Sequence, residues 1–182
     1  MLKHHVEAIK IFKPISAGSN YFEQSSDDIW QKVCVCIKAI TSDIDKMKIK
    51  GIGFDATCSL VLLDNDNKPL TVSPTKNNDQ NIIMWMDHRA QEEADFINSL
   101  HHDVLKYVGG KVSLEMQIPK LLWLKKYLYE DSFNKIHHAF DLPDFLTFKA
   151  TGKTSRSVCS LTCKFNYDAV KGEFQSDYFE EI

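Results

Sequence analysis

Long apolar stretches and a surplus of basic charge are both missing from this sequence. Apolar runs are short, as in Leu60–Leu63, whereas a membrane-spanning helix needs roughly 20 apolar residues. The 22 Lys and Arg residues are outnumbered by 25 Asp and Glu residues, and nucleic-acid-binding domains usually carry a basic excess. The N-terminal residues contain no signal-peptide pattern. We therefore expect a cytoplasmic protein whose partners include neither a membrane nor a nucleic acid.

Disulfide, nucleotide and metal motifs are also scarce. The 5 cysteines are an odd number in apolar surroundings, which favours reduced thiols over a disulfide framework. Only 7 glycines occur, with no Gly-x-Gly-x-x-Gly pattern and no Walker-type lysine loop, so this chain has no recognisable nucleotide site. Cys159 and Cys163 could share a helix face, but no second Cys or His pair is spaced to complete a zinc site. We expect no metal site.

The 182 residues suffice for one sizeable domain or for part of a larger one. Apolar periodicity predicts an α/β fold with strands over 51–55, 59–63, 68–72 and 82–85. The same criterion predicts helices over 26–41, 89–105 and 120–129, with shorter ones around 132–139 and 143–148. The strands are few for so many helices, so we interpret the chain as part of a larger α/β domain.

Two polar clusters each follow a predicted strand. The first contains Asp55, Thr57 and Cys58, and the second is Trp-Met-Asp-His-Arg, which includes Asp87 and Arg89. Ligands of open α/β sheets collect at strand ends, so we expect Asp55 and Asp87 to lie on one side of the sheet, within one pocket. In the alternative interpretation, Asp55 and Thr57 form hydrogen bonds with backbone groups of a turn, and Asp87 is a helix N-cap.

Three further acids lie at or shortly before the starts of predicted helices. Asp141 and Asp144 flank a Leu-Pro pair and are interpreted as helix-capping, structural residues. Glu115 lies shortly before the helix that contains Lys120, where a solvated helix entrance is the simplest interpretation.

Several segments together resemble the FGGY family of carbohydrate kinases, and within it the D-ribulose (pentulose) kinase branch. The resemblance runs in order along nearly the whole chain from about residue 12. It is carried by Glu23–Trp30, Gly51–Val61, Trp85–Ala90, Tyr107–Gly110, Ser113–Lys125, Phe140–Leu146, Lys149–Gly152 and Ser157–Leu161.

The resemblance implies a partial RNase H-like (actin-like ATPase) domain with a mixed sheet flanked by helices. It implies transfer of the ATP γ-phosphate, with Mg²⁺, to a hydroxyl of a pentulose such as D-ribulose. Carried over residue by residue, the sugar-binding positions of the family fall on Asp55, Ala56, Thr57, Cys58, Asp87, Arg89 and Glu115. The resemblance is also compatible with a homodimer of the complete enzyme.

The family's first phosphate-binding hairpin and its C-terminal half have no counterpart in residues 1–182. The catalytic aspartate and the adenine site are expected beyond Ile182, so we expect neither ATP nor Mg²⁺ to bind this chain alone. Two hypotheses follow: this is the sugar-binding part of a pentulose kinase, inactive alone, or it is a non-catalytic fragment that binds a sugar or a partner.

Overall fold

The computed structural model describes residues 3–14 and 20–182. Four short strands form one sheet in the order β1-β3-β2-β4, with β1 at Glu23–Gln24, β3 at Ile82–Ile83, β2 at Leu60–Leu63 and β4 at His138–Asp141. All three strand pairings within the described residues are antiparallel. A sheet flanked by helices confirms the predicted α/β class.

Alternate residues of β2 pack on opposite faces of the sheet, because successive side chains of a strand point to opposite sides. Val61 and Leu63 join one apolar cluster, beneath α1 (Ser26–Thr41) and α4 (Leu142–Thr151). Leu60 and Leu62 join a larger cluster on the other face. Both faces are covered, as the continuous apolar strand predicts.

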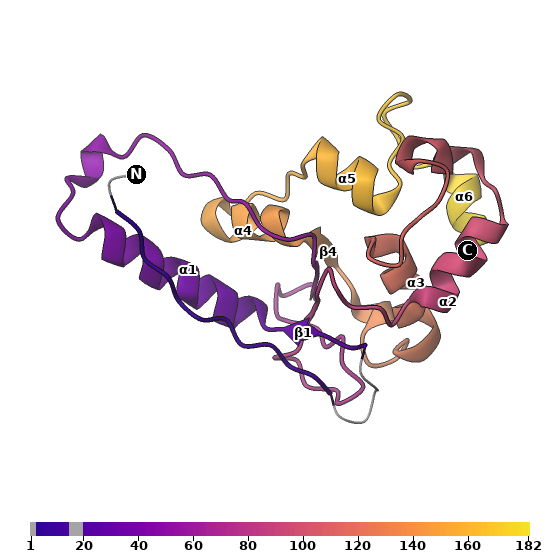
Figure 1. Cartoon of the computed structure of the whole chain (residues 1–182), viewed down its shortest axis with the longest axis horizontal. Helices are drawn as coiled ribbons and strands as arrows, with labels where there is room; N and C mark the ends of the chain where they lie inside the picture. The colour runs from indigo at the N-terminus through magenta and orange to yellow at the C-terminus, as the bar shows by residue number, and fades with distance from the viewer. Residues whose placement is uncertain (1–2, 15–19) are drawn as a thin grey trace.

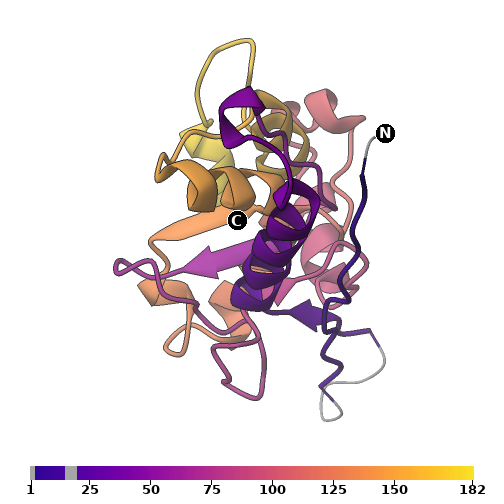
Figure 2. The same cartoon turned by 90° about the vertical axis from the view of Figure 1, so that its left-hand side faces the viewer.

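The larger cluster is covered by the remaining helices. Figure 2 shows α1 crossing in front of the strands, and most of the other helices lie on the opposite side of the sheet in Figure 1. These helices are α2 (Gln91–Ser99), α3 (Gln117–Tyr127), α5 (Val158–Phe165) and α6 (Ser176–Glu181). Short 3₁₀ turns η2 (Lys46–Lys48), η3 (Asp103–Val108) and η4 (Phe133–Lys135) complete the elements. None of the helices among the described residues has both the length and the apolar composition to cross a membrane.

Most predicted helices are present with shifted ends. α1 spans the predicted residues 26–41, and Ser25 caps it by accepting a hydrogen bond from the Asp28 amide at 3.3 Å. The predicted helix 89–105 is divided, because His101 has a positive φ of 52° between α2 and η3. α3 begins at Gln117 and α4 extends past the predicted 143–148 on both sides.

The expected helix over 132–139 is wrong, because its last residues belong to β4 instead. Each of the four residues of β4 pairs with one residue of β2, from Leu63↔His138 to Leu60↔Asp141. The Phe140 ring also stacks on Phe148, with centroids 5.1 Å apart. Long-range pairing overrides the local helical pattern here.

The predicted strands 51–55 and 68–72 are also not strands. Residues 51–58 form no ladder with any described residue, and a strand is defined by its ladder. Residues 68–72 run back beside β2, as expected for a hairpin, but only the isolated bridge Leu63↔Pro69 and single hydrogen bonds connect them. Segment 51–59 therefore approaches the sheet as an extended loop and enters it at Leu60.

Candidate functional site

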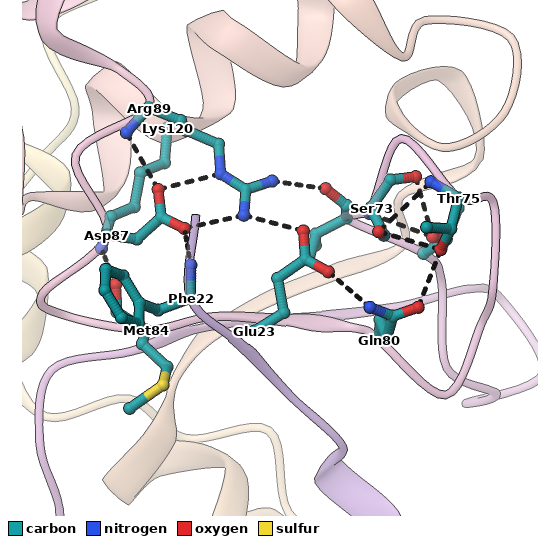
Figure 3. Close-up of polar contacts among 11 residues, drawn as sticks. Phe22, Glu23, Ser73, Thr75, Gln80, Met84, Asp87, Arg89 and Lys120 are labelled. Carbon is teal, nitrogen blue, oxygen red and sulfur yellow. Dashed lines mark hydrogen bonds and ion pairs between the residues drawn. The ribbon is translucent and has the colours of Figure 1, made fainter. Parts of the chain in front are cut away.

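The second predicted cluster forms a buried ionic network centred on Arg89 (Figure 3). Arg89 Nε donates to Asp87 Oδ1 at 2.9 Å, and Nη2 donates to Asp87 Oδ2 at 2.7 Å and to Glu23 Oε1 at 2.8 Å. Nη1 donates to the Val72 carbonyl at 2.6 Å. The side chains of Arg89, Asp87 and Glu23 are all 0% exposed.

Polar and aromatic neighbours complete this network. Asp87 Oδ2 accepts from the Phe22 amide at 2.7 Å, and Glu23 Oε2 accepts from Gln80 Nε2 at 2.9 Å. The guanidinium lies 4.2 Å from the Tyr21 ring centroid and 5.0 Å from that of Trp123. Strand β1, the loop after β3 and helix α3 are thus joined through one cation.

The electrostatics fit a structural ion cluster. Burial would by itself lower the pKa of Arg89, but hydrogen bonds and charge from Asp87, with Glu23, outweigh it and raise the pKa above its ordinary value. Burial raises the pKa of Glu23, although Arg89 opposes this. Two carboxylates sharing one cation are stable inside a protein only while that cation is present.

The structure places Asp87 and Arg89, which were predicted to contact a sugar, inside this network. Both side chains are enclosed, and the hydrogen bonds of the guanidinium go to protein oxygens. Asp55, by contrast, is exposed on the loop before β2, so the structure does not bring Asp55 and Asp87 into one pocket. The helix-cap alternative also fails, because α2 begins at Gln91 with Ala90 at its N-cap.

The loop with the other predicted sugar residues is tied to the end of β3. The Trp85 amide donates to Ser59 Oγ at 3.2 Å, and Ser59 Oγ lies 3.4 Å from the hydroxyl of Thr57. Thr57 is exposed, and Ala56 packs against the apolar cluster under α1 and α4. Glu115 is half-buried and lies 3.7 Å from His88 Nε2, close to the loop after β3.

Cys58, the last of these loop residues, lines a cavity of about 350 Å³. Its walls are formed by loop 54–58 and by the helices α4 and α5, together with Asp141 just before α4 and Ser157 just before α5. Its lining residues are Phe54, Cys58, Asp141, Pro143, Asp144, Thr147, Ser157, Cys159, Ser160, Cys163 and Lys164. The cavity therefore combines carboxylates, hydroxyls, an amine and thiols.

Two carboxylates of this cavity are buried, and that of Asp144 is incompletely paired. Asp144 is 6% exposed, and its Oδ1 accepts from the Ser157 amide at 3.0 Å. Its Oδ2 has no hydrogen-bond partner among the described residues. Asp141 Oδ1 accepts from Gln117 Nε2 at 2.6 Å, and burial raises the pKa of Asp141 to about 6, against the lowering effects of Gln117 and Lys164.

A buried lysine lies between the cavity and the ionic network. Lys120 is 0% exposed and donates from Nζ to the Met84 carbonyl at 3.0 Å. Burial lowers its pKa to about 8, although the charges of Asp87 and Asp141 oppose this. An ammonium held between two acids positions the end of β3 relative to α3.

Sequence reasoning missed the cavity and assigned two of its acids to helix capping. Asp141 does occupy the N-cap of α4, but its side chain makes no capping hydrogen bond and accepts from Gln117 instead. Lys164 and Ser160 were not singled out. The sequence did contain one signal for this cavity, because Asp141 ends an apolar segment. That position indicates a ligand site only if the segment is recognised as a strand, since ligands collect at strand ends.

Comparison with known proteins identifies the family. The model of the FGGY family of carbohydrate kinases, N-terminal domain, matches residues 2–180. The human "FGGY carbohydrate kinase domain-containing protein" is 55% identical over 153 residues, which are 84% of this chain and 28% of that protein. A D-ribulokinase of Saccharomyces cerevisiae is 53% identical over 150 residues, 80% of this chain and 21% of that protein.

Solved structures show the same fold at low sequence identity. A ligand-bound xylulose kinase from Lactobacillus acidophilus superposes with a TM-score of 0.77 at 20% identity, over 96% of this chain and 33% of that one. A xylulose kinase from Rhodospirillum rubrum superposes with a TM-score of 0.73 at 16% identity, over 95% of this chain and 34% of that one. The fold is thus that of the actin-like sugar kinases, as the resemblance implied. The chain spans about a third or less of the length of these relatives. It belongs to the FGGY family of carbohydrate kinases and matches the N-terminal domain of that family.

Proposed function

We propose that the whole protein is an ATP-dependent kinase that phosphorylates a hydroxyl of a pentulose such as D-ribulose, and that this chain supplies most of the sugar-binding surface. The relative named D-ribulokinase supports this substrate class, since it is 53% identical over most of this chain. Proteins named ribulokinase from two Staphylococcus species are 30–31% identical over 90% of the chain.

The observation that carries this proposal is the free carboxylate oxygen in the cavity. A buried acceptor without a donor is costly, whereas a sugar hydroxyl entering the cavity would supply that donor. Asp144 Oδ2 is such an acceptor, and Lys164 on the facing helix offers N–H donors for a second sugar oxygen. Donors and acceptors on opposing walls suit a ligand whose hydroxyls both donate and accept.

The loop before β2 and the segment before α3 extend this proposed site. We assign sugar-facing roles to Asp55, Thr57 and Cys58 on the loop, and to Glu115 beside His88. Ala56 packs inward and holds the loop against the sheet. Asp87 and Arg89 are positioning residues in this proposal, because they fix the end of β3, to which the loop is hydrogen-bonded through Ser59.

ATP and Mg²⁺ belong to the proposed reaction. Among residues 3–14 and 20–182, no group of three or more His, Cys, Asp or Glu side chains could hold a metal ion. Following the family resemblance, we place Mg²⁺ and ATP elsewhere in the whole protein.

Sugar titrations of cavity variants test the proposed site. D-ribulose and D-xylulose would be titrated by calorimetry into the wild-type chain, Lys164→Gln and the control Lys149→Gln, which removes an exposed lysine of α4 outside the cavity. Losing a charged hydrogen-bond donor costs about 1.5–3 kcal/mol, so Lys164→Gln should raise Kd roughly tenfold or more. Lys149→Gln should bind like the wild type. Absence of pentulose binding to a folded wild-type chain, or equal Kd values for both variants, would contradict this site.

A further inference from the structure

Three thiols line the cavity that we assign to the sugar. Cys58 lies on the loop before β2, and Cys159 and Cys163 lie one turn apart on α5. Cys159 and Cys163 are exposed and Cys58 is half-buried, so a small oxidant in solution can reach this cluster. The metal-binding explanation for such a cluster fails, since none of the described His, Cys, Asp and Glu residues form a group of three suited to a metal ion.

The three thiols face the same cavity, and the electrostatics of Cys163 reflect both of its neighbours. Burial, followed by the charge of Cys159 and its hydrogen bond, raises the pKa of Cys163, and the charge of Cys58 acts in the same direction. The loop and α5 therefore place their sulfur atoms in one electrostatic neighbourhood, although Cys58 and Cys163 are far apart in sequence.

Helix geometry decides which pair can form a covalent bond. Residues four apart on a helix have Cβ atoms about 5–6 Å apart, whereas a disulfide needs roughly 3.8 Å. A bond between Cys159 and Cys163 would therefore unwind part of α5. Cys58 lies on a loop outside any helix or strand, so helix geometry does not fix its distance from Cys163.

We propose that Cys58 and Cys163 are a redox modification site, at which hydrogen peroxide produces a reversible disulfide between the loop and α5. One thiolate attacks the O–O bond, expels hydroxide and becomes a sulfenic acid. The second thiolate attacks that sulfur and releases the oxygen as water. In total two thiols and one peroxide give one disulfide and two waters, with two electrons passing from sulfur to oxygen.

The bond would join two walls of the cavity and so regulate access to it. This consequence rests on the proposed function, since it assumes that the sugar binds there. We expect oxidation to raise the Kd for the pentulose at least tenfold, and reduction by a dithiol to restore it.

Peptide mapping tests the bond without reference to sugar binding. The purified chain would be treated with hydrogen peroxide, its remaining thiols alkylated, and the protein digested with trypsin under non-reducing conditions. Trypsin leaves Cys58 in peptide 51–76, because Lys68 precedes Pro69, and it leaves both α5 cysteines in peptide 157–164. We expect these peptides to be disulfide-linked, with Cys159 alkylated.

Two variants sharpen the mapping. Cys163→Ser should abolish the linked peptide, whereas the matched control Cys159→Ser, on the same helix and in the same cavity, should retain it. A bond confined to peptide 157–164 would overturn the proposal. Oxidation mainly at Cys34 or Cys36, the two half-buried cysteines of α1, would also overturn it. The peptide map of the wild-type chain alone shows which cysteines are linked, so the test remains valid even if a variant does not fold.

Sugar titration of the reduced and oxidised chains separates the two proposals. A linked peptide in a chain that binds no pentulose when reduced would contradict the proposed function and leave the disulfide standing. Pentulose binding without a linked peptide would overturn the disulfide alone. A linked peptide with unchanged sugar affinity would overturn the regulatory consequence.

Discussion

Arg89 contacts the carboxylates of both Asp87 and Glu23, and its removal should destabilise the fold. Breaking a buried ion pair by deleting one partner costs about 3–5 kcal/mol, because a buried charge is left uncompensated. We expect Arg89→Met to lower the free energy of unfolding by about that amount in urea denaturation. Arg89→Lys should lose less, because it keeps the charge but not the two-pronged contact with Asp87.

An exposed ion pair provides the control for this experiment. Lys68 and Asp66 are 3.1 Å apart, with side chains 71% and 62% exposed. Surface pairs of this kind contribute about 0–1 kcal/mol, so Lys68→Met should barely change the urea midpoint. If Arg89→Met were as stable as Lys68→Met but bound the sugar poorly, Arg89 would be a sugar contact after all.

The raised pKa of Asp141 predicts a pH dependence of stability. Between the ordinary value near 4 and the folded value of about 6, the folded state binds more protons than the unfolded state. Stability contributed by Asp141 is therefore complete below pH 4, falls as the pH rises, and levels off above about pH 6. The full difference is on the order of 3 kcal/mol.

Asp141→Asn isolates this effect, because an amide does not titrate. Urea unfolding at a series of pH values should show the variant gaining stability relative to the wild type from pH 4 to 6. A constant difference across that range would show that the Asp141 carboxyl is not perturbed. Taking the difference between the two proteins removes the contribution of Glu23, whose pKa is also raised.

At the scale of elements, α1 forms where the sequence places a capping serine, two first-turn acids and one apolar face. The Ser25 hydroxyl accepts from the Asp28 amide, and loss of an N-cap side chain costs about 1 kcal/mol. Ser25→Ala should therefore lower the free energy of unfolding by about 1 kcal/mol.

Ser42→Ala is the matched control at the other end of α1, where the exposed hydroxyl only donates to the Ala39 carbonyl. Ser42→Ala should change the free energy of unfolding by no more than about 0.5 kcal/mol. Equal losses for the two variants in urea denaturation would show that the Ser25 cap adds nothing beyond side-chain removal.

At the scale of the whole molecule, we expect this chain alone to lack sugar kinase activity. Phosphoryl transfer depends on neutralising and positioning the γ-phosphate, and the described residues offer no metal-binding cluster for that purpose. Purified chain would be incubated with ATP, Mg²⁺ and a panel of pentuloses, and ADP release measured. Sugar-dependent release above a blank would contradict the prediction, and Asp55 would then be the first residue to substitute.

The sequence alone determined those features whose causes are local. The cap and apolar face of α1 lie within a few residues of each other, and they predicted its ends. The apolar run at β2 predicted a strand covered on both faces. The ordered motifs identified the family through resemblance, and the matching family model confirms it.

Only the tertiary structure decided the features that join distant residues. β4 became a strand because β2 offered a partner, and Asp141 thereby moved from a helix cap to the wall of a cavity. Arg89 looked like a ligand contact from its local motif, yet Glu23, 66 residues away, makes it part of a buried network. Local periodicity reports which face of an element is apolar, but pairing and burial depend on what the rest of the chain brings to that face.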